Sequence, residues 1–220
     1  MKGLRIFSAI SLLAFVSGFL CAGPMPERVT HLRVADGDVA FTLVGQVTNS
    51  PPDKSVQVGY LPTISGLTGL FSSAPEGEAT AYFTFFNDTH TTAVRHSGPI
   101  TVIEREGTAT IYAQSTPHGD FADPTSFQGG DPILVMSLKQ QVVVDTGSKV
   151  FTVVIVQTVT DSNAFQKDGQ KYDLAFAGDR FRISFTGALN GTPPPSGFFS
   201  GYAVRIPRDF GLHLLERIEN

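Results

Sequence analysis

Three side chains with ligand chemistry lie within one short, loop-like stretch of the sequence. His118, Asp120 and Asp123 fall within six residues and are followed by Pro124. An imidazole and two carboxylates are groups that Zn²⁺, Mn²⁺ or Ca²⁺ accept as ligands. Their spacing matches no strong metal signature, and Asp, Gly and Pro are ordinary loop residues. We therefore name these three as candidate ligand-binding residues, with an ordinary exposed loop as the alternative, and expect no metal or other cofactor.

A second candidate for chemistry is the string Asp145-Thr146-Gly147-Ser148, which follows three valines. It resembles the catalytic loop of pepsin-type and retroviral aspartic proteases, in which two aspartates share a proton. The chain has one such string, and the nearest candidate for the second signature, Ala175-Phe176-Ala177-Gly178, starts only 30 residues later. Gly accepts positive φ and Asp bonds its own backbone. The favoured interpretation is therefore a hairpin turn, and an aspartic peptidase is the weaker alternative.

Other catalytic signatures are missing from the sequence. It contains no Ser nucleophile elbow, no Gly-rich phosphate loop, no HExxH motif and no cysteine cluster. This removes the commonest hydrolase, nucleotide-binding and zinc-protease hypotheses. No catalytic residue is named, and a protein that is not an enzyme is favoured.

The first 22 residues have the anatomy of a secretory signal peptide. Lys2 and Arg5 precede an apolar run from Ile6 to Leu20, and small residues follow it. The run has 15 residues, whereas a transmembrane helix needs about 20. We expect residues 1–22 to be cleaved, and the mature chain to be secreted or periplasmic and free of the membrane.

The composition indicates a domain that is stable without crosslinks. Cys21 is the only cysteine, so cleavage after Ala22 leaves no disulfide. Lipidation of Cys21 is the alternative, although bulky Leu20 stands where lipoprotein signals have a small residue. A chain of about 200 residues can bury a full core unaided. The formal net charge is −4 and Lys and Arg form no runs, so nucleic acid and a polybasic membrane contact are set aside as partners.

Between Val39 and Ile206 the hydrophobic pattern has the period of β-strands. From Lys149 to Thr160, one face is apolar and the other mixed, and nearly every residue is β-branched or aromatic. The same alternation recurs at Thr80–Phe86, Thr108–Thr116, Arg180–Thr186 and Phe198–Ile206. The expected inward residues are Ile111, Ala113, Phe181, Ile183 and Phe185. We predict roughly nine or ten antiparallel strands.

Short polar clusters between these runs are predicted to be hairpin turns. They are Asn87-Asp88-Thr89, Arg105-Glu106-Gly107, Thr146-Gly147-Ser148, Lys167-Asp168-Gly169 and Ala177-Gly178-Asp179. Asn87 and Asn190 also begin glycosylation sequons, which would mark exposed turns in a eukaryotic protein.

Two longer segments, Leu61–Gly77 and Thr116–Asp131, interrupt the strand pattern, and such segments are often functional. The first either packs its leucines on the sheet or forms a lid over a cavity. Asp209–Ile218 is expected to be a short helix or a frayed tail.

An all-β domain with this many strands must hide its edges. We expect a single antiparallel β-barrel or, alternatively, a two-sheet β-sandwich over residues 39–206, flanked by an N-terminal segment, 23–38, and a C-terminal tail, 207–220. In size, hairpin rhythm and phenylalanine content the chain is similar to secreted barrels of the lipocalin or the dirigent and allene-oxide-cyclase kind. This resemblance concerns architecture, and it implies no ligand or activity.

Two classes of function fit such a domain. The leading hypothesis is a secreted binding module for a small apolar ligand or for an extracellular partner. The second is a barrel-type cyclase or isomerase acting on a small organic substrate, which requires polar groups such as Tyr112, Arg180 and Arg182 to point into a cavity. The sequence leaves the ligand and the oligomeric state open.

Overall fold

The structure, a computed structural model, describes residues 28–190 and 196–208. The expected signal peptide, residues 1–22, and the expected helix Asp209–Ile218 lie outside the described residues.

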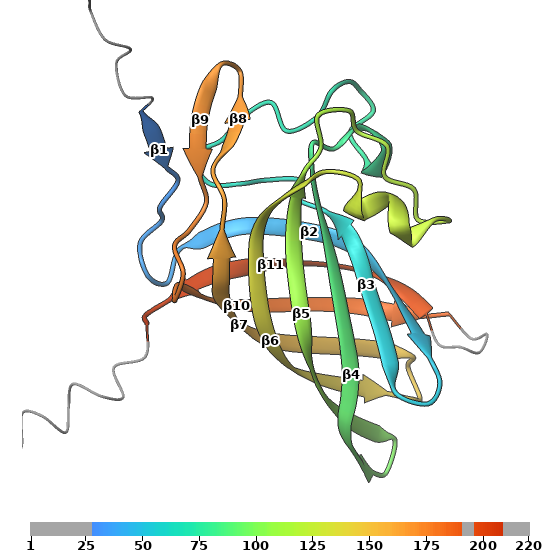
Figure 1. Cartoon of the computed structure of the whole chain (residues 1–220). Helices are drawn as coiled ribbons and strands as arrows, with labels where there is room; N and C mark the ends of the chain where they lie inside the picture. Colours follow the sequence, from blue (N-terminus) through green and yellow to red (C-terminus); the bar gives the residue numbers. More distant parts are fainter. Residues whose placement is uncertain (1–27, 191–195, 209–220) are drawn as a thin grey trace, which may run out of the picture.

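Eight antiparallel strands close into a barrel, so the barrel alternative is confirmed over the sandwich (Figure 1). The strands are β2 (Val39–Ser50), β3 (Lys54–Tyr60), β4 (Phe83–Ser97), β5 (Ile100–Ala113), β6 (Asp131–Asp145), β7 (Val150–Ser162), β10 (Arg180–Leu189) and β11 (Ser196–Ile206). Neighbours in this order are hydrogen-bonded, and β11 pairs back onto β2. Closure leaves no free edge among these strands.

A small three-stranded sheet stands beside one end of the barrel. Its strands are β1 (Val29–His31), β8 (Phe165–Lys167) and β9 (Gln170–Asp173), and β1 runs parallel to β9. Two 3₁₀-helices, η1 (Glu78–Thr80) and η2 (Pro124–Gln128), lie in the connections before β4 and before β6. None of the helices in the described ranges is long and apolar enough to cross a membrane.

The two ends of the barrel differ in their connections (Figure 1). The short hairpins β2–β3, β4–β5 and β6–β7 lie at one end, together with the end of β10 and the beginning of β11. The long connections before β4, before β6 and before β10 lie at the other. Leu61, Ile64 and Leu70 of the first long connection are buried in the core. The expectation that these apolar residues pack on the sheet is therefore confirmed.

Two of the predicted turns are wrong. Asn87-Asp88-Thr89 lies inside β4, and Arg105-Glu106-Gly107 lies inside β5. Their polar side chains suggested a reversal, but Asn87, Thr89 and Arg105 are buried in the polar part of the barrel interior. Asn87 is therefore not on an exposed turn. Thr146-Gly147-Ser148 and Lys167-Asp168-Gly169 lie at hairpin turns, as predicted. Ala177-Gly178-Asp179 also lies at a turn, but this turn connects β9 to β10, which belong to different sheets and do not pair.

Aromatic rings pack against one another inside the barrel. Phe85, Phe185 and Phe199 form one group, in which the rings of Phe185 and Phe199 are stacked with centroids 4.1 Å apart. Gly45 gives these rings room, because a Cβ there would stand 2.7 Å from Phe199 Cζ. Of the predicted inward residues, Ile111, Phe181, Ile183 and Phe185 are buried, and Ala113 is half-buried.

Candidate functional site

The sequence-predicted residues His118, Asp120 and Asp123 lie in one exposed loop next to η2. The loop itself uses their polar atoms. His118 Nδ1 is 2.8 Å from the carbonyl oxygen of Thr116, and Asp120 Oδ1 accepts a hydrogen bond from the Ala122 N–H. Within the described ranges, no group of three His, Cys, Asp or Glu side chains is arranged to hold a metal ion. Their role in ligand binding stays a prediction.

Asp123 caps the first turn of η2. Its Oδ1 accepts hydrogen bonds from the backbone N–H and the hydroxyl of Thr125. We expect Asp123→Ala to lower the free energy of unfolding by about 1 kcal/mol, because the N–H loses its partner. Asp123→Ser keeps a capping oxygen, so we expect it to lower the free energy of unfolding by only about a few tenths of a kcal/mol. Equal losses for both variants in urea titrations would contradict the capping role.

The protease-like string forms the β6–β7 hairpin turn. Asp145 Oδ2 accepts a hydrogen bond from the Ser148 hydroxyl, and Oδ1 accepts one from the Gly147 N–H. The Ser148 hydroxyl, followed by the backbone N–H groups of Gly147 and Ser148, lowers the pKa of the Asp145 carboxyl below its usual value. Both carboxylate oxygens thus serve the turn, as the favoured interpretation predicts.

The polar groups named for a cyclase or isomerase are not inside the barrel. Arg182 is exposed and alternates with buried Phe181 and Ile183. Tyr112 and Arg180 are half-buried, and neither lines the cavity described below. The cyclase hypothesis therefore loses these three candidates.

A cavity of about 410 Å³ occupies the barrel at the end that carries the short hairpins. Its residues come from β2 to β7, from β10 and from the hairpin turns. None of the three loop residues His118, Asp120 and Asp123 lines it. An eight-stranded barrel has an interior just wide enough for packed side chains or one small ligand. Here one end is packed and the other is hollow.

The wall of this cavity has an apolar side and a polar side. Most apolar side chains come from β6, β7 and β10 and include Val142, Val144, Phe151, Val153 and Leu189; Val47, Val94 and Ile103 add apolar groups from β2, β4 and β5. Polar side chains come mainly from β2 to β6 and include Asn49, Gln57, Thr91, Arg105 and Gln140. A ligand with an apolar body and a polar end would match both sides.

Among the described residues that line the cavity, Arg105 is the buried charged one, and it is only 7% exposed. It points inward because it alternates along β5 with the outward, exposed Glu106. Nη1 donates to Ser55 Oγ at 2.9 Å, and Nη2 donates to Asn49 Oδ1 at 2.7 Å. Nε makes a longer contact of 3.4 Å with the Thr91 hydroxyl. All three partners are uncharged.

Burial lowers the pKa of Arg105 to about 10. The guanidinium therefore stays charged at neutral pH. Within the described ranges Arg105 forms no ion pair. The other charged residues that line the cavity, Asp53 and Lys54, are exposed at its rim. Lys54 pairs with Asp88 at 3.3 Å. A buried cation without an anion is costly, and such groups concentrate at functional sites.

A chain of amides crosses the barrel beside Arg105. Asn87 Nδ2 donates to Gln57 Oε1 at 3.2 Å, and Gln57 Nε2 donates to Gln140 Oε1 at 2.8 Å. Gln140 is only 4% exposed, and within the described part of the chain its Nε2 has no hydrogen-bond partner. Gln140 is also the cross-strand neighbour of Arg105. This series of amides therefore ends at Gln140 Nε2, an unused hydrogen-bond donor in the cavity wall beside Arg105.

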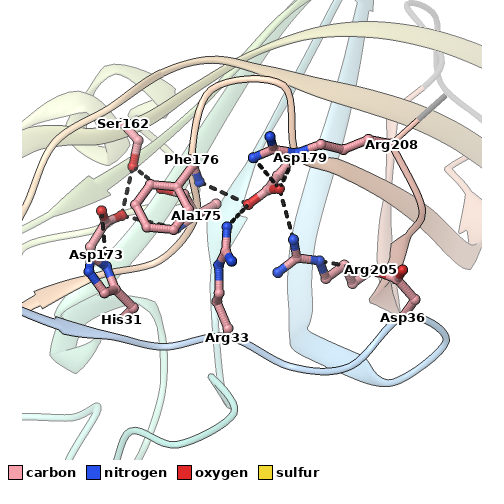
Figure 2. Close-up of polar contacts among 10 residues, drawn as sticks. All are labelled: His31, Arg33, Asp36, Ser162, Asp173, Ala175, Phe176, Asp179, Arg205 and Arg208. Atoms are coloured by element: carbon pink, nitrogen blue, oxygen red, sulfur yellow. Dashed lines mark hydrogen bonds and ion pairs between the residues drawn. The ribbon is translucent and has the colours of Figure 1, made fainter. Parts of the chain in front are cut away.

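A second charged cluster, at the opposite end of the barrel, is structural (Figure 2). Asp179 is fully buried and accepts hydrogen bonds from Arg205 and Arg208, both at 2.8 Å, and from the Phe176 N–H. Arg33 lies 3.8 Å from its other carboxylate oxygen. These contacts join the segment after β1, the start of β10 and the end of β11. Both carboxylate oxygens of Asp179 are used inside the fold, and the cluster holds these three segments together.

Sequence reasoning missed Arg105, Gln140 and Gln57 as site residues. One available signal is a polar residue among the inward, apolar residues of an alternating strand. Gln140 shows this signal, because it lies between the inward residues Leu138 and Val142. Comparisons of the chain with protein-family models, with curated proteins and with solved structures find no match. The cavity and its lining are therefore the basis for assigning a function.

Proposed function

We propose that this protein is a binding module that holds a small, largely apolar molecule in the open end of its barrel. The observation that carries the proposal is the cavity of about 410 Å³, lined on one side by valine, leucine and phenylalanine. Small-molecule sites are typically concave, mostly apolar and about 300–1,000 Å³ in volume, with few polar groups that orient the ligand. The proposed setting is extracytoplasmic, because residues 1–22 have the anatomy of a signal peptide.

The cavity is built on rigid elements of the fold, which favours binding over a purely structural role. Its walls are strands of a closed barrel, and strands are rigid supports for a site. Apolar side chains that line an open space lose the contacts a packed core would give them. A bound apolar molecule would restore those contacts, and each methylene group it buries is worth about 0.8 kcal/mol.

Filling the cavity should abolish binding. Val142 is buried on β6 and lines the cavity. Val142→Phe places a ring in open space, so we expect the affinity for Nile red or dodecanol to fall at least about tenfold while the fold is retained. The change is measured by the fluorescence of Nile red, an uncharged dye, and by isothermal titration calorimetry with dodecanol.

The matched control is Val143→Phe, one residue further along the same strand. Val143 is half-buried and alternates with the buried valines that line the cavity, so its ring would add bulk to the outer face. We expect unchanged affinity for this variant. Wild-type affinity in Val142→Phe, or an equal loss in both variants, would place the binding site elsewhere.

A further inference from the structure

We propose that the ligand is an apolar carboxylic acid, whose carboxylate binds Arg105 and Gln140 and whose hydrocarbon part lies against the apolar wall. This inference rests on the proposed function, because it names the ligand class for the same cavity. The following observations carry it.

First, Arg105 is a buried cation that has no anionic partner among residues 28–190 and 196–208. Its side chain is 7% exposed, and its hydrogen-bond partners Asn49, Ser55 and Thr91 are neutral. Buried charges in proteins are normally paired. The nearby rim residues carry opposite charges, Asp53 and Lys54, and both are exposed. An anion bound in the cavity would supply the missing charge.

Second, the wall has hydrogen-bond donors to spare. A guanidinium has five N–H groups, and the described contacts of Arg105 use one on each of Nε, Nη1 and Nη2. One N–H on each Nη is therefore left. The Nε2 of Gln140 is a further unused donor. Arg105 and Gln140 are directly opposite each other on β5 and β6, and side chains in that relation have Cβ atoms about 5 Å apart.

Third, these groups match a carboxylate better than a phosphate. A guanidinium fork binds the two oxygens of a carboxylate through parallel hydrogen bonds. A phosphate monoester would bring about 1.5–2 negative charges against the one buried cation of the described cavity wall. The apolar wall, which includes Val144, Phe151 and Val153, leaves room for a hydrocarbon body and not for a second charged group.

The test compares dodecanoic acid with dodecanol, two probes with the same chain and different head groups. Calorimetric titrations at about pH 8, where the acid is ionised, give the dissociation constant of each. For the wild-type protein we expect the acid to bind about tenfold to hundredfold more tightly than the alcohol, because a charged hydrogen bond in a buried site is stronger than a neutral one. For Arg105→Met we expect this preference to vanish while the alcohol still binds.

Three controls make the result specific. Arg105→Gln keeps a polar side chain and should lose the preference as well, which covers the case of poor folding in the Met variant. Arg95→Met removes an exposed arginine on β4, which is paired with Glu104, and should leave the preference unchanged. The melting temperature of the ligand-free Arg105→Met protein should stay the same or rise, since a buried unpaired charge is removed.

The outcomes separate the two proposals. Equal affinities of wild-type protein for acid and alcohol would overturn the carboxylate proposal and leave apolar binding in place. A preference for the acid that survives in both Arg105 variants would also overturn it. Binding of neither probe would overturn both proposals together.

Discussion

Replacing Asp179 by asparagine is expected to lower the free energy of unfolding by about 3 kcal/mol, one of the two largest effects that a single substitution should have in this protein. Asp179 is fully buried, and three arginines converge on its carboxylate (Figure 2). The asparagine side chain would be neutral, so the cations would face one another without an anion between them.

The size of this effect follows from burial. Breaking a buried ion pair by removing one partner costs about 3–5 kcal/mol. We expect the lower end of this range, because Arg33 and Arg208 are about half exposed, at 45% and 52%, and water screens their charges. Arg205 is 14% exposed and carries most of the interaction. Urea unfolding followed by circular dichroism measures the change, since the chain has no tryptophan to report on it.

Asp36→Asn is the matched control for Asp179→Asn. Asp36 also pairs with Arg205, at 3.2 Å, but it is 51% exposed. Exposed ion pairs contribute about 0–1 kcal/mol, so this variant should unfold almost as the wild type does. Similar losses for the two variants would show that burial of Asp179 is not what makes its carboxylate important.

The fold could be predicted because its signal is repeated in every strand. When every second residue is apolar and inward, as with Phe151, Val153 and Ile155, the pattern predicts a β-strand and also shows which of its faces is buried. The choice between barrel and sandwich could not be made this way. It depends on the pairing of β11 with β2 and of β10 with β7, contacts between residues far apart in the sequence.

The candidate site could not be predicted because its residues looked like something else. Arg105 is followed by Glu106 and Gly107, a composition typical of a turn, yet β5 continues through it. Gly107 is needed there for a different reason, since a Cβ would collide with the Asp88 carbonyl of the adjacent strand β4. The inward row of β6 marks Gln140, but its partners could not be predicted, because the hydrogen-bond network that includes it is built from several strands.

The two long irregular segments, Leu61–Gly77 and Thr116–Asp131, lie at the end of the barrel opposite the cavity. Loops are often functional, and a functional role for these two segments stays a prediction. Both lie at the packed end of the barrel, where Leu61 and Phe127 are buried. The cavity opens among short hairpins. The residue types of these turns predict a chain reversal and do not indicate a cavity between them.

The second large effect is expected at Phe185, which separates the cavity from the packed half of the barrel. Phe185 lines the cavity of about 410 Å³ and also a second one of about 20 Å³. Its ring is stacked on that of Phe199, and its ring centroid lies 6.4 Å from the ring centroid of Phe151. Phe185→Ala should lower the free energy of unfolding by about 3–5 kcal/mol, because it removes a buried ring and leaves a void.

The same substitution should change which ligands the protein prefers. With the ring gone, the two cavities would join and a longer hydrocarbon chain could reach the packed half. Each further methylene buried is worth about 0.8 kcal/mol, or roughly a fourfold gain in affinity. We therefore expect Phe185→Ala to favour hexadecanol over dodecanol relative to the wild type, as calorimetric titration would show.

Phe181→Ala separates the loss of stability from the change in preference. Phe181 lies in the same inward row of β10, is equally buried and contacts Phe41, yet it lines neither cavity. This variant should be destabilised to a similar extent and keep the wild-type preference for chain length. If Phe181→Ala altered the preference as Phe185→Ala does, a general loosening of the barrel would explain both results. A shift confined to Phe185→Ala would identify its ring as the floor of the binding cavity.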